Sequence, residues 1–520
     1  MQSKTLSITD SVFVSSLTLQ QVDTINLTNC TFTGIKGYAL FIDKAKSVRI
    51  MNCTFKNISN TIQGSNHGVL CGNGILSMQI LNCVFDDIEG TAIRFPVGGT
   101  IKPEDRNGSI IMSGCRIQRI RSKDNFLGNG IVMFHVNSVF VLGNRFTNID
   151  HHAMVFGRNG TPQELDIQRI DMSMIQGNRI DSVLGNGILV CENVINPQVK
   201  DNQIHHIAYD GKGALPDEGD HGIYWQAKGG LIQNNGILYN RDGMVQGNPG
   251  SGISIRSNAQ VLQNITGYCT GNGIGYYADH DAKGALTIMN NVIFNNQRNG
   301  LYLNANGVQG RQPDSVIILH NTILNEKVQD LSHQSCPIAL NEIKSPFTIA
   351  GNYTVYVNQL NPLDHIRMFN TTNQSNVIYN LFASNASEFV NPSIGDFKLL
   401  ENSVAINYAK HGISIMLDRD NRFRNGIPDA GAYEYGIPAS IREDVSGFIT
   451  TMNHIIMREE RNVKACAIYS FTGEKETCSF TQNQSTLSLS IPESLPAGVY
   501  LCRITYAGEQ IREFPIIHMP

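Results

Sequence analysis

Side chains able to carry out acid–base chemistry gather in one part of this 520-residue chain, between about residues 209 and 304. Arg256 would neutralise a substrate carboxylate and acidify the C–H bond beside it. His221 would take the proton, and Tyr224 or Tyr277 would protonate the leaving oxygen. Asp220, directly before His221, would orient the imidazole. These residue types together point to a β-elimination.

Further side chains of this region, together with two histidines of an earlier rung, are candidate contacts to a substrate. They are His151, His152, Gln226, Asp279, His280 and Tyr302. Some candidates have a structural alternative. His152 and His221 stand where other repeats carry Asn, Ser or Thr, so they would equally continue a ladder of polar turn residues. Arg256 would equally be a solvated surface arginine or pair with Asp279.

Paired carboxylates offer a second chemistry, glycoside hydrolysis. Asp217 with Asp220, or Asp220 with Asp279, are the candidate pairs. Such carboxyl groups lie about 5–5.5 Å apart in retaining enzymes and about 6.5–9.5 Å apart in inverting ones. Asp220-His221-Gly222 stands where a polygalacturonase-like enzyme would have Gly-His-Gly, which weakens this alternative.

A third alternative needs no catalysis, because tyrosines can simply stack against sugar rings. Tyr224, Tyr277 and Tyr302 would then form the binding surface of a glycan binder or adhesin. No cofactor is indicated with certainty. A Ca²⁺ site would need several convergent oxygens, and Asp210, Asp217 and Glu218, which read more readily as loop surface, would permit one without demonstrating it.

The elements that position these residues form a repeat. A small turn followed by an apolar strand recurs, as in 129–134, 186–190, 251–255 and 299–303. A second repeated sequence motif precedes it, as in Asn52-Cys53-Thr54-Phe55. Copies lie roughly 23 to 34 residues apart, the period of a solenoid whose stacked copies form parallel sheets.

Stacking of the copies assigns each position to a column. One column is always apolar or aromatic and includes Trp225, which we expect in the core. Gln226, Arg256 and Tyr277 share an outward column, with neighbours about 5 Å apart. In another column early rungs carry Cys, as at Cys53, and later rungs carry Asn. We expect buried free thiols there, with disulfides between neighbouring rungs as the alternative.

Insertions between the repeats should wall a groove over the outward face. Residues 209–220 and 240–250 are the long ones, and they precede neighbouring strands. The column exceptions fall close to the same rungs, since His151, Asp220 and Arg298 replace a recurrent Gly. The polar rungs near 150–158 and 220–281 are therefore the expected site.

Composition excludes several classes of protein. Charged residues make up 16% of the chain and the net charge is −4, which gives no footprint for nucleic acid. No apolar run approaches the roughly 20 residues of a transmembrane helix. Met1-Gln2-Ser3-Lys4 is not followed by the core of a signal peptide, and the repeat is already present there. We expect the natural chain to begin earlier, with any export signal upstream.

These repeats, over residues 5–395, resemble the right-handed parallel β-helix of the pectate-lyase-like superfamily. Residues 396–435, with Asp418-Arg419-Asp420 and 429–435, resemble the closing segment of secreted bacterial β-helix proteins. Residues 468–474 and 495–501 resemble the C-terminal sorting domain of the Bacteroidetes type 9 secretion system, although the basic residues often found at its end are missing.

The expected fold is therefore all-β, a parallel β-helix followed by a small β-sandwich. We expect a β-helix with closing segment over 1–436, a linker over 437–446 and a sorting-like sandwich over 447–520. The resemblance implies a secreted or cell-surface carbohydrate-active protein, monomeric, whose partners are a polysaccharide and the secretion machinery. A polysaccharide lyase acting on a uronic-acid polymer is favoured over a hydrolase, and the two enzyme alternatives taken together are favoured over a binder.

Overall fold

The computed structural model describes most of the chain. It describes residues 4–520 except 60–66, 96–104, 123–127, 159–168, 211–218, 242–248, 281–282, 307–310, 326–334, 358, 360, 372–374, 410–416, 423, 425–426, 437–448, 452–453, 459–461, 471–474, 484–485, 491–497, 508–510 and 519–520. The insertion residues 211–218 and 242–248 and the predicted linker 437–446 thus lie outside the described part.

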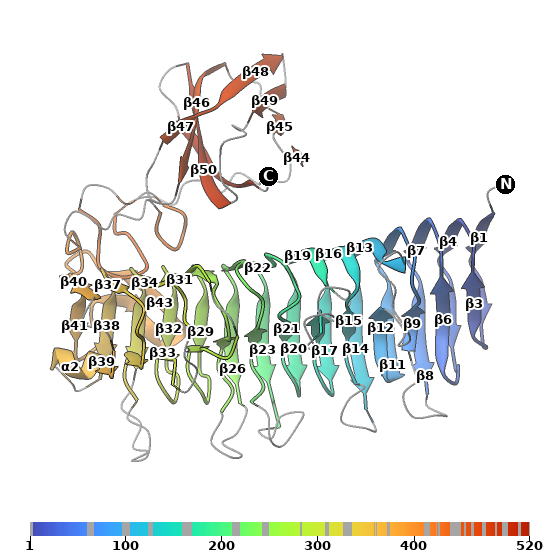
Figure 1. Ribbon diagram of the computed structural model, residues 1–520, viewed down its shortest axis with the longest axis horizontal. Coiled ribbons are helices and arrows are strands. Elements are labelled where there is room, and N and C mark those ends of the chain that lie inside the picture. The colour runs from blue at the N-terminus through green and yellow to red at the C-terminus, as the bar shows by residue number, and fades with distance from the viewer. Residues whose placement is uncertain are drawn as a thin grey trace.

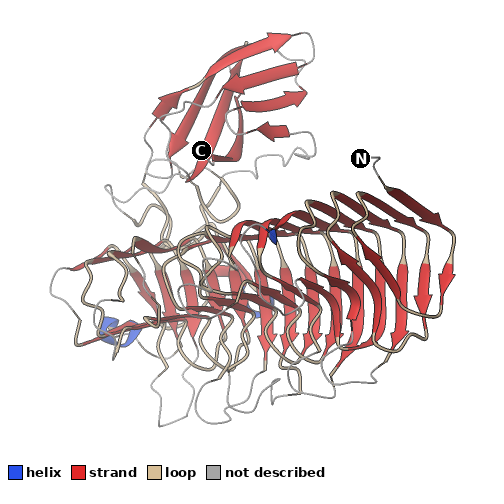
Figure 2. Ribbon diagram, turned by 45° about the vertical axis from the view of Figure 1, so that its right-hand side comes forward, coloured by secondary structure: helices blue, strands red, loops and turns tan. Residues whose placement is uncertain are grey.

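Three long parallel sheets, here called A, B and C, run side by side along a solenoid (Figures 1 and 2). They hold 14, 14 and 13 strands, and each strand pairs with the strand three places later in the chain. Each rung therefore adds one strand to each sheet in the order A, B, C. The arrangement confirms the predicted parallel β-helix.

The strands alternate regularly between the three sheets. Sheet A consists of β1 (Thr5–Thr9), β4 (Thr24–Thr28), β7 (Ser47–Met51), β10 (Ser77–Leu81), β13 (Asn107–Ser113), β16 (Val136–Leu142), β19 (Ile170–Gln176), β22 (Gln198–Lys200), β25 (Leu231–Gln233), β28 (Gln260–Leu262), β31 (Ala285–Met289), β34 (Ser315–Leu319), β37 (Phe347–Ala350) and β40 (Ser375–Ile378). Sheet B consists of β2 (Val12–Phe13), β5 (Thr31–Thr33), β8 (Thr54–Ile58), β11 (Val84–Glu89), β14 (Arg116–Arg121), β17 (Arg145–Ile149), β20 (Arg179–Val183), β23 (Gln203–Ile207), β26 (Gly236–Asn240), β29 (Ile265–Gly267), β32 (Val292–Phe294), β35 (Thr322–Asn325), β38 (Tyr353–Tyr356) and β41 (Leu381–Ala383). Sheet C consists of β3 (Leu17–Gln20), β6 (Tyr38–Asp43), β9 (His67–Cys71), β12 (Thr91–Phe95), β15 (Ile131–Met133), β18 (Met154–Phe156), β21 (Ile188–Val190), β24 (Ile223–Trp225), β27 (Ile253–Ile255), β30 (Ile274–Tyr277), β33 (Leu301–Asn304), β36 (Ile338–Asn341) and β39 (Ile366–Phe369).

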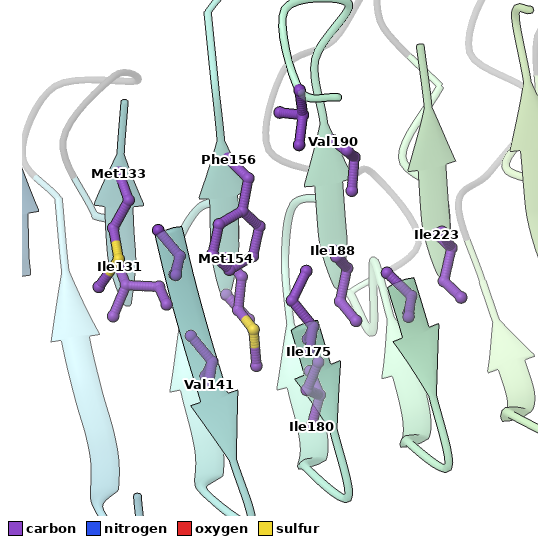
Figure 3. Close-up of a cluster of buried hydrophobic side chains, with 14 of the residues drawn as sticks. Ile131, Met133, Val141, Met154, Phe156, Ile175, Ile180, Ile188, Val190 and Ile223 are labelled. Carbon is purple, nitrogen blue, oxygen red and sulfur yellow. The ribbon is translucent and has the colours of Figure 1, made fainter. Parts of the chain in front are cut away.

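The core is a stack of like side chains inside the three sheets. In sheet C, Ile131 pairs with Met154 and Met154 with Ile188 across neighbouring strands, and all three are fully buried. Figure 3 shows these side chains pointing into the same interior as Val141 and Ile175 of sheet A. Because the strand period is two, the intervening side chains must point outward. Trp225 is fully buried, which confirms its predicted place in the core.

A column of small polar side chains lines the turns from sheet A to sheet B. In its later rungs each Asn side chain accepts the backbone N–H of the rung before, as Asn264 does from Asn235 at 3.0 Å. Its own amide donates to a carbonyl, here that of Ile232 at 2.9 Å. The ladder satisfies turn groups that would otherwise be buried without partners. In earlier rungs Cys53 and its equivalents carry buried free thiols, as predicted.

The residue before each ladder position takes a left-handed backbone. Asn82 has φ 52°, Gly143 has φ 62° and Asn290 has φ 54°. Asn and Gly adopt this region at little cost, which accounts for their abundance in the chain.

The closing segment packs on the outer side of the last rungs. Around β42 (Phe389–Asn391), the 3₁₀ helix η3 (Pro392–Ile394) and β43 (Asp396–Leu399), the side chains of Phe389 and Phe397 join those of sheet B in a second apolar cluster. Residues 417–435 then tie into the turns between sheets A and B. The Leu417 carbonyl accepts from Asn290 at 2.7 Å, and the Asp418 carbonyl accepts from Gln263 at 2.8 Å.

A buried ion pair holds this segment together. Arg424 and Glu434, whose side chains are 1% and 5% exposed, lie 3.1 Å apart. We expect Arg424→Met to destabilise the protein by about 3–5 kcal/mol, because it leaves the Glu434 carboxylate buried without its cation. Urea unfolding would measure the loss, with the exposed Arg145→Met as control. Equal midpoints for the two variants would contradict a structural role for the pair.

The remaining described strands form two antiparallel sheets. One orders β44 (Ile449–Thr451), β45 (His454–Arg458), β49 (Thr486–Ser490) and β48 (Ser479–Asn483), and the other orders β47 (Lys475–Thr477), β46 (Val463–Ser470), β50 (Gly498–Tyr506) and β51 (Ile511–His518). Leu487 and Leu489 of the first share a core with Ile468 and Ile504 of the second, which makes a small sandwich. Cys466 and Cys478 form a disulfide across it.

Helix is scarce in the described part of the chain. One short helix there, α2 (Pro362–His365), is capped by Asn361, whose side-chain oxygen accepts the Leu363 N–H at 3.1 Å. No helix within the described ranges is long and apolar enough to cross a membrane.

Candidate functional site

The candidate site lies on the outer face of sheet C. One outward column passes from Tyr224 through Ser254 and Gly275 to Tyr302. Two small residues thus separate two tyrosines that are three rungs apart, about 14 Å. A Cβ at Gly275 would meet the Tyr277 ring at 3.1 Å, so the glycine lets that ring lie back over the strand. The column therefore carries a tyrosine at each end and two small, buried residues between them.

Arg256 stands at the middle of this surface. Its guanidinium lies 5.0 Å from the Tyr224 ring centre and 4.5 Å from that of Tyr277. It also pairs with the Asp279 carboxylate at 2.6 Å, as one of the sequence alternatives expected. The Asn272 amide donates to the Tyr277 oxygen at 3.2 Å, which leaves the phenolic proton available. Cation–π contacts and one ion pair therefore fix the direction of the cation.

The Tyr277 phenol keeps its proton unless a strong base, such as a leaving oxygen, forms beside it. Burial raises the pKa of Tyr277 above its ordinary value of 10.0, and the positive charge of Arg256 opposes that rise. The ring also meets the Tyr302 ring edge-on at 5.8 Å. At neutral pH the phenol is therefore protonated, as a general acid must be.

His280 joins the same surface through a turn that folds back over sheet C. Its backbone N–H donates to the Arg256 carbonyl at 3.0 Å. Its Nδ1 lies 3.3 Å from a carboxylate oxygen of Glu192. A carboxylate at Nδ1 keeps the proton there and leaves the Nε2 lone pair available as a base. Burial lowers the pKa of His280 below 6.5, while Glu192 opposes that shift, so the ring is neutral near pH 7.

Glu192 is the member of this group that the sequence analysis missed. The signal was present, because Glu192 stands where later rungs have the small residues Ala227, Ser257 and Ala278. The same column holds His135 and Arg158 in the two rungs before Glu192, so the change to small residues starts only after Glu192.

His221 belongs to a second ladder, in the turns from sheet B to sheet C. Its backbone N–H donates to Asn186 Oδ1 at 2.7 Å, and its Nδ1 accepts the Ser251 N–H at 2.9 Å. The proton therefore lies on Nε2, and the nitrogen able to accept one is already engaged. Burial, with the charge of Arg256, lowers the pKa of His221 to about 3. The general-base role first assigned to His221 does not fit this geometry, and the ring can act only as a donor.

Asp220 and the remaining histidines are also interior residues. Asp220 is 2% exposed and accepts from the Asn186 amide at 3.3 Å, so it does not orient His221 in a dyad. His152 Nδ1 accepts the Asn186 N–H at 2.9 Å, and His151 Nδ1 donates to Asn129 at 2.9 Å. His152 therefore precedes His221 by two rungs in the same ladder, and the structure does not bring these two rings beside Arg256.

Gln226 and Tyr302 complete the predicted set. Gln226 shares the outward column of Arg256 but is 5% exposed, and its Oε1 finds no hydrogen-bond partner in the described structure. Tyr302 ends the aromatic surface beside Tyr277. The structure thus brings together Tyr224, Arg256 and Tyr277 with Tyr302, Asp279 and His280, and sets the buried histidines and Asp220 in the turns beside them.

The ladder role of His221 has a consequence for stability in acid. A histidine that is buried neutral stabilises the fold above its unfolded pKa of about 6.5, and that contribution is lost as the pH falls towards its folded pKa of about 3. The wild type should lose stability between pH 7 and pH 5. In His221→Asn, which places at this position the residue type of Asn186, that loss should be smaller by about 2 kcal/mol. Urea unfolding at the two pH values, with the more exposed His206→Asn as control, measures this. Parallel losses in wild type and His221→Asn would contradict it.

A metal centre and a separate pocket are the other kinds of site that such a protein could carry. Among the described residues, no three His, Cys, Asp or Glu side chains gather as metal ligands would. The loop acids Asp217 and Glu218 lie outside those residues. A shallow depression at the corner between sheets B and C is lined by Asp87, Arg119, Arg121, Asn148 and Asp150. Its arginines already pair with acids, Arg121 with Asp87 and Arg119 with Asp86, so it is not part of the site.

The rung pattern agrees with a known family. The family described as "Right handed beta helix region" matches residues 15–215 and 129–323, which together cover more than half of the chain. The chain belongs to the right-handed β-helix family. No curated protein sequence matches this β-helix protein.

Solved structures similar to this β-helix protein include two kinds of protein. A pectate lyase is 12% identical, with 70% of this chain and 89% of the lyase covered at a TM-score of 0.38. A periplasmic alginate epimerase is 10% identical, with 69% and 78% covered at a TM-score of 0.33.

Proposed function

We propose that this protein is a polysaccharide lyase that cleaves a uronic-acid-containing polymer by β-elimination. The observation that carries the proposal is a cation held between two tyrosines, with a carboxylate-oriented histidine beside it. Arg256, Tyr277 and His280 supply the three functions that the reaction needs, a cation, an acid and a base.

The roles follow from the protonation state of each group. Arg256 binds the uronate carboxylate and stabilises the negative charge that develops when the C–H bond next to it breaks. His280 Nε2 takes that proton, and Glu192 stabilises the imidazolium that results. The electron pair forms the new carbon–carbon double bond and expels the glycosidic oxygen. Tyr277 gives its proton to that oxygen, and Tyr224 stacks against the sugar.

Exposure of the acids favours elimination over hydrolysis. A hydrolase needs two carboxyl groups that reach the substrate from opposite sides. Asp220 is 2% exposed, and Asp279 is paired with Arg256 at 2.6 Å. Neither is placed as a free acid or nucleophile at the sugar.

A substrate screen tests the proposal. Purified protein is incubated with uronate polymers, and the unsaturated product is followed by its ultraviolet absorbance. Turnover of a uronate polymer with that absorbance is the expected result. Reducing ends released from a neutral glycan, without unsaturated product, would replace the lyase with a hydrolase. Glycan binding without turnover of any substrate would replace it with a binder.

His280→Gln tests the base. We expect the rate to fall roughly hundredfold, because an amide cannot take the proton. In the wild type the rate should rise with pH to a plateau as His280 loses its proton, with a midpoint below 6.5 because burial lowers that pKa. The variant should lose this rise. A wild-type pH profile in His280→Gln would move the base elsewhere, and Glu192→Gln should shift the midpoint down because it removes the opposing charge.

We further propose that the protein acts as a monomer outside the cell or at its surface, after export through the type 9 system. The support is the resemblance of residues 468–474 and 495–501 to its sorting domain. Two domains joined by residues 437–446 would fit this use, since the sandwich has its own core. Limited proteolysis should cut within 437–446. In a host with that secretion system, deletion of residues 447–520 should keep the protein inside the cell, and unchanged export would contradict the proposal.

A further inference from the structure

Two neighbouring side chains of the candidate site carry buried polar atoms without partners. Gln226 is 5% exposed, and its Oε1 accepts no hydrogen bond from any described residue. The Nε–H of Arg256 is also buried and donates to none of them. An unsatisfied buried group costs about 1–3 kcal/mol, so few such groups persist in a fold without a reason. Here an acceptor and a donor are left open on adjacent strands.

The strand register places Gln226 directly beside Arg256. The Gln226 N–H donates to the Val190 carbonyl at 2.8 Å. In the next rung the Arg256 N–H donates to the Trp225 carbonyl, also at 2.8 Å. The Gln226 side chain therefore lies in the outward column between those of Cys191 and Arg256, on strands about 4.8 Å apart.

The base of the proposed reaction spans the same position. His280 donates its backbone N–H to the Arg256 carbonyl at 3.0 Å. Its Nδ1 lies 3.3 Å from a carboxylate oxygen of Glu192, the residue after Cys191. The turn thus reaches from the rung of Arg256 to the rung of Glu192, and Gln226 belongs to the rung between them. A sugar that Arg256 holds and His280 reaches therefore lies over Gln226.

The two open groups require different partners on one ligand. The Arg256 N–H is a donor and suits a carboxylate oxygen, whereas the Gln226 oxygen is an acceptor and suits a hydroxyl. A uronic acid carries both groups on one ring. A ring whose hydroxyl has been esterified leaves the Gln226 oxygen without a donor, and such a mismatch with a buried polar group is costly.

We propose that Gln226 is a specificity-determining residue, whose side-chain oxygen accepts a hydrogen bond from a free hydroxyl of the uronate ring bound at Arg256. The inference rests on the proposed function, and it makes that function more specific. The preferred substrate is a uronate polymer whose rings carry no acyl group on that hydroxyl. O-acetylated stretches of the same polymer bind and react less well.

The test compares unmodified and O-acetylated forms of one polymer in the Gln226→Met variant. Polygalacturonate and alginate are each used before and after chemical acetylation, and Kd is measured in the His280→Gln background, where turnover is slow. Methionine fills a similar space and removes the acceptor. We expect Gln226→Met to raise the Kd of the unmodified polymer about tenfold, the cost of one lost hydrogen bond at a buried acceptor. The Kd of the acetylated form should stay as it is without this change.

Three measurements distinguish recognition of the sugar from a structural role. Gln198→Met changes a buried glutamine of sheet A, 7% exposed, and should keep the preference for the unmodified polymer. Thermal unfolding of Gln226→Met should stay at the wild-type midpoint or rise, because a buried acceptor without a partner is removed. Gln226→Glu places a carboxylate beside Arg256, so it should weaken binding of both polymer forms. A midpoint several degrees lower in Gln226→Met would overturn the proposal, since Gln226 would then support the fold.

Binding and turnover fail separately if one of the two proposals is wrong. If Gln226→Met keeps the preference for the unmodified polymer while Arg256→Gln stops turnover, the role of Gln226 is wrong and the lyase stands. If no uronate polymer is cleaved but Gln226→Met still removes the preference in binding, the role of Gln226 stands and the lyase is wrong. Equal binding of the two forms without the Gln226 change, or binding of neither, would overturn the role of Gln226, as would an equal loss in Gln198→Met.

Discussion

Replacing Arg256 with glutamine is expected to lower kcat/KM about thousandfold on the uronate polymer that the protein cleaves. The guanidinium is most useful after the C–H bond has begun to break, when negative charge spreads into the substrate carboxylate, and loss of one such group costs about 10²–10³ in rate. Thermal unfolding should change by no more than a few degrees, because the side chain is 19% exposed and packs on the outside of sheet C. Ultraviolet detection of the unsaturated product measures the rate.

Two companion variants separate charge from geometry at this position. Arg256→Lys keeps the cation but loses the flat group that lies 4.5 Å from the Tyr277 ring, so an intermediate loss of rate is expected. Asp279→Asn removes the ion pair and leaves the cation in place, so it should retain most of the activity. Full activity in Arg256→Gln would remove the central group from the mechanism.

Replacing Asn264 with leucine is expected to have the largest effect on stability. Asn264 accepts the Asn235 N–H and side-chain amide, each at 3.0 Å. It donates to the Ile232 carbonyl at 2.9 Å and to Asn291 at 3.0 Å. Leucine leaves several of these groups buried without partners, at about 1–3 kcal/mol each, so we expect a loss of roughly 3–6 kcal/mol. Because rungs contact only their neighbours, unfolding should also separate into two transitions, visible in calorimetry.

The early rungs of the chain provide the matched control. There the same column holds cysteine, and the Cys83 thiol sulfur accepts the Cys53 N–H at 3.4 Å. Asn264→Cys should therefore cost clearly less than Asn264→Leu, because the sulfur still offers a weak acceptor to the Asn235 N–H. Equal losses in the two variants would mean that volume, and not hydrogen bonding, sets the stability of the column.

Much of the fold and part of the site could be predicted from the sequence. The repeat period indicates which residues stack, so Trp225 is found inside and Arg256 and Tyr277 share an outward column. A column relates only residues at the same offset in each repeat. It therefore does not predict the contact of His280 with Glu192, which come from rungs three apart and meet because the chain turns back after β30.

The role of His221 shows a second limit of the sequence. A histidine at that position is compatible with a turn ladder and with a catalytic base, so the residue type does not distinguish the two roles. The distinction depends on which ring nitrogen accepts a hydrogen bond, and here the Ser251 N–H occupies Nδ1. That contact comes from the next rung and follows from the stacking distance, which a list of residue types does not contain.

The closing segment gives the solenoid a direction of unfolding. It forms hydrogen bonds with the turns of successive late rungs, through Gln263, Asn290 and His320. The first two of these turns belong to the rungs that carry Tyr277 and Tyr302, whereas the early rungs depend on the weaker hydrogen bonds of thiols. Heat or denaturant should therefore unfold the array from its N-terminal end. The rungs near Arg94 should lose their order first, and the rungs around Arg256 should be among the last.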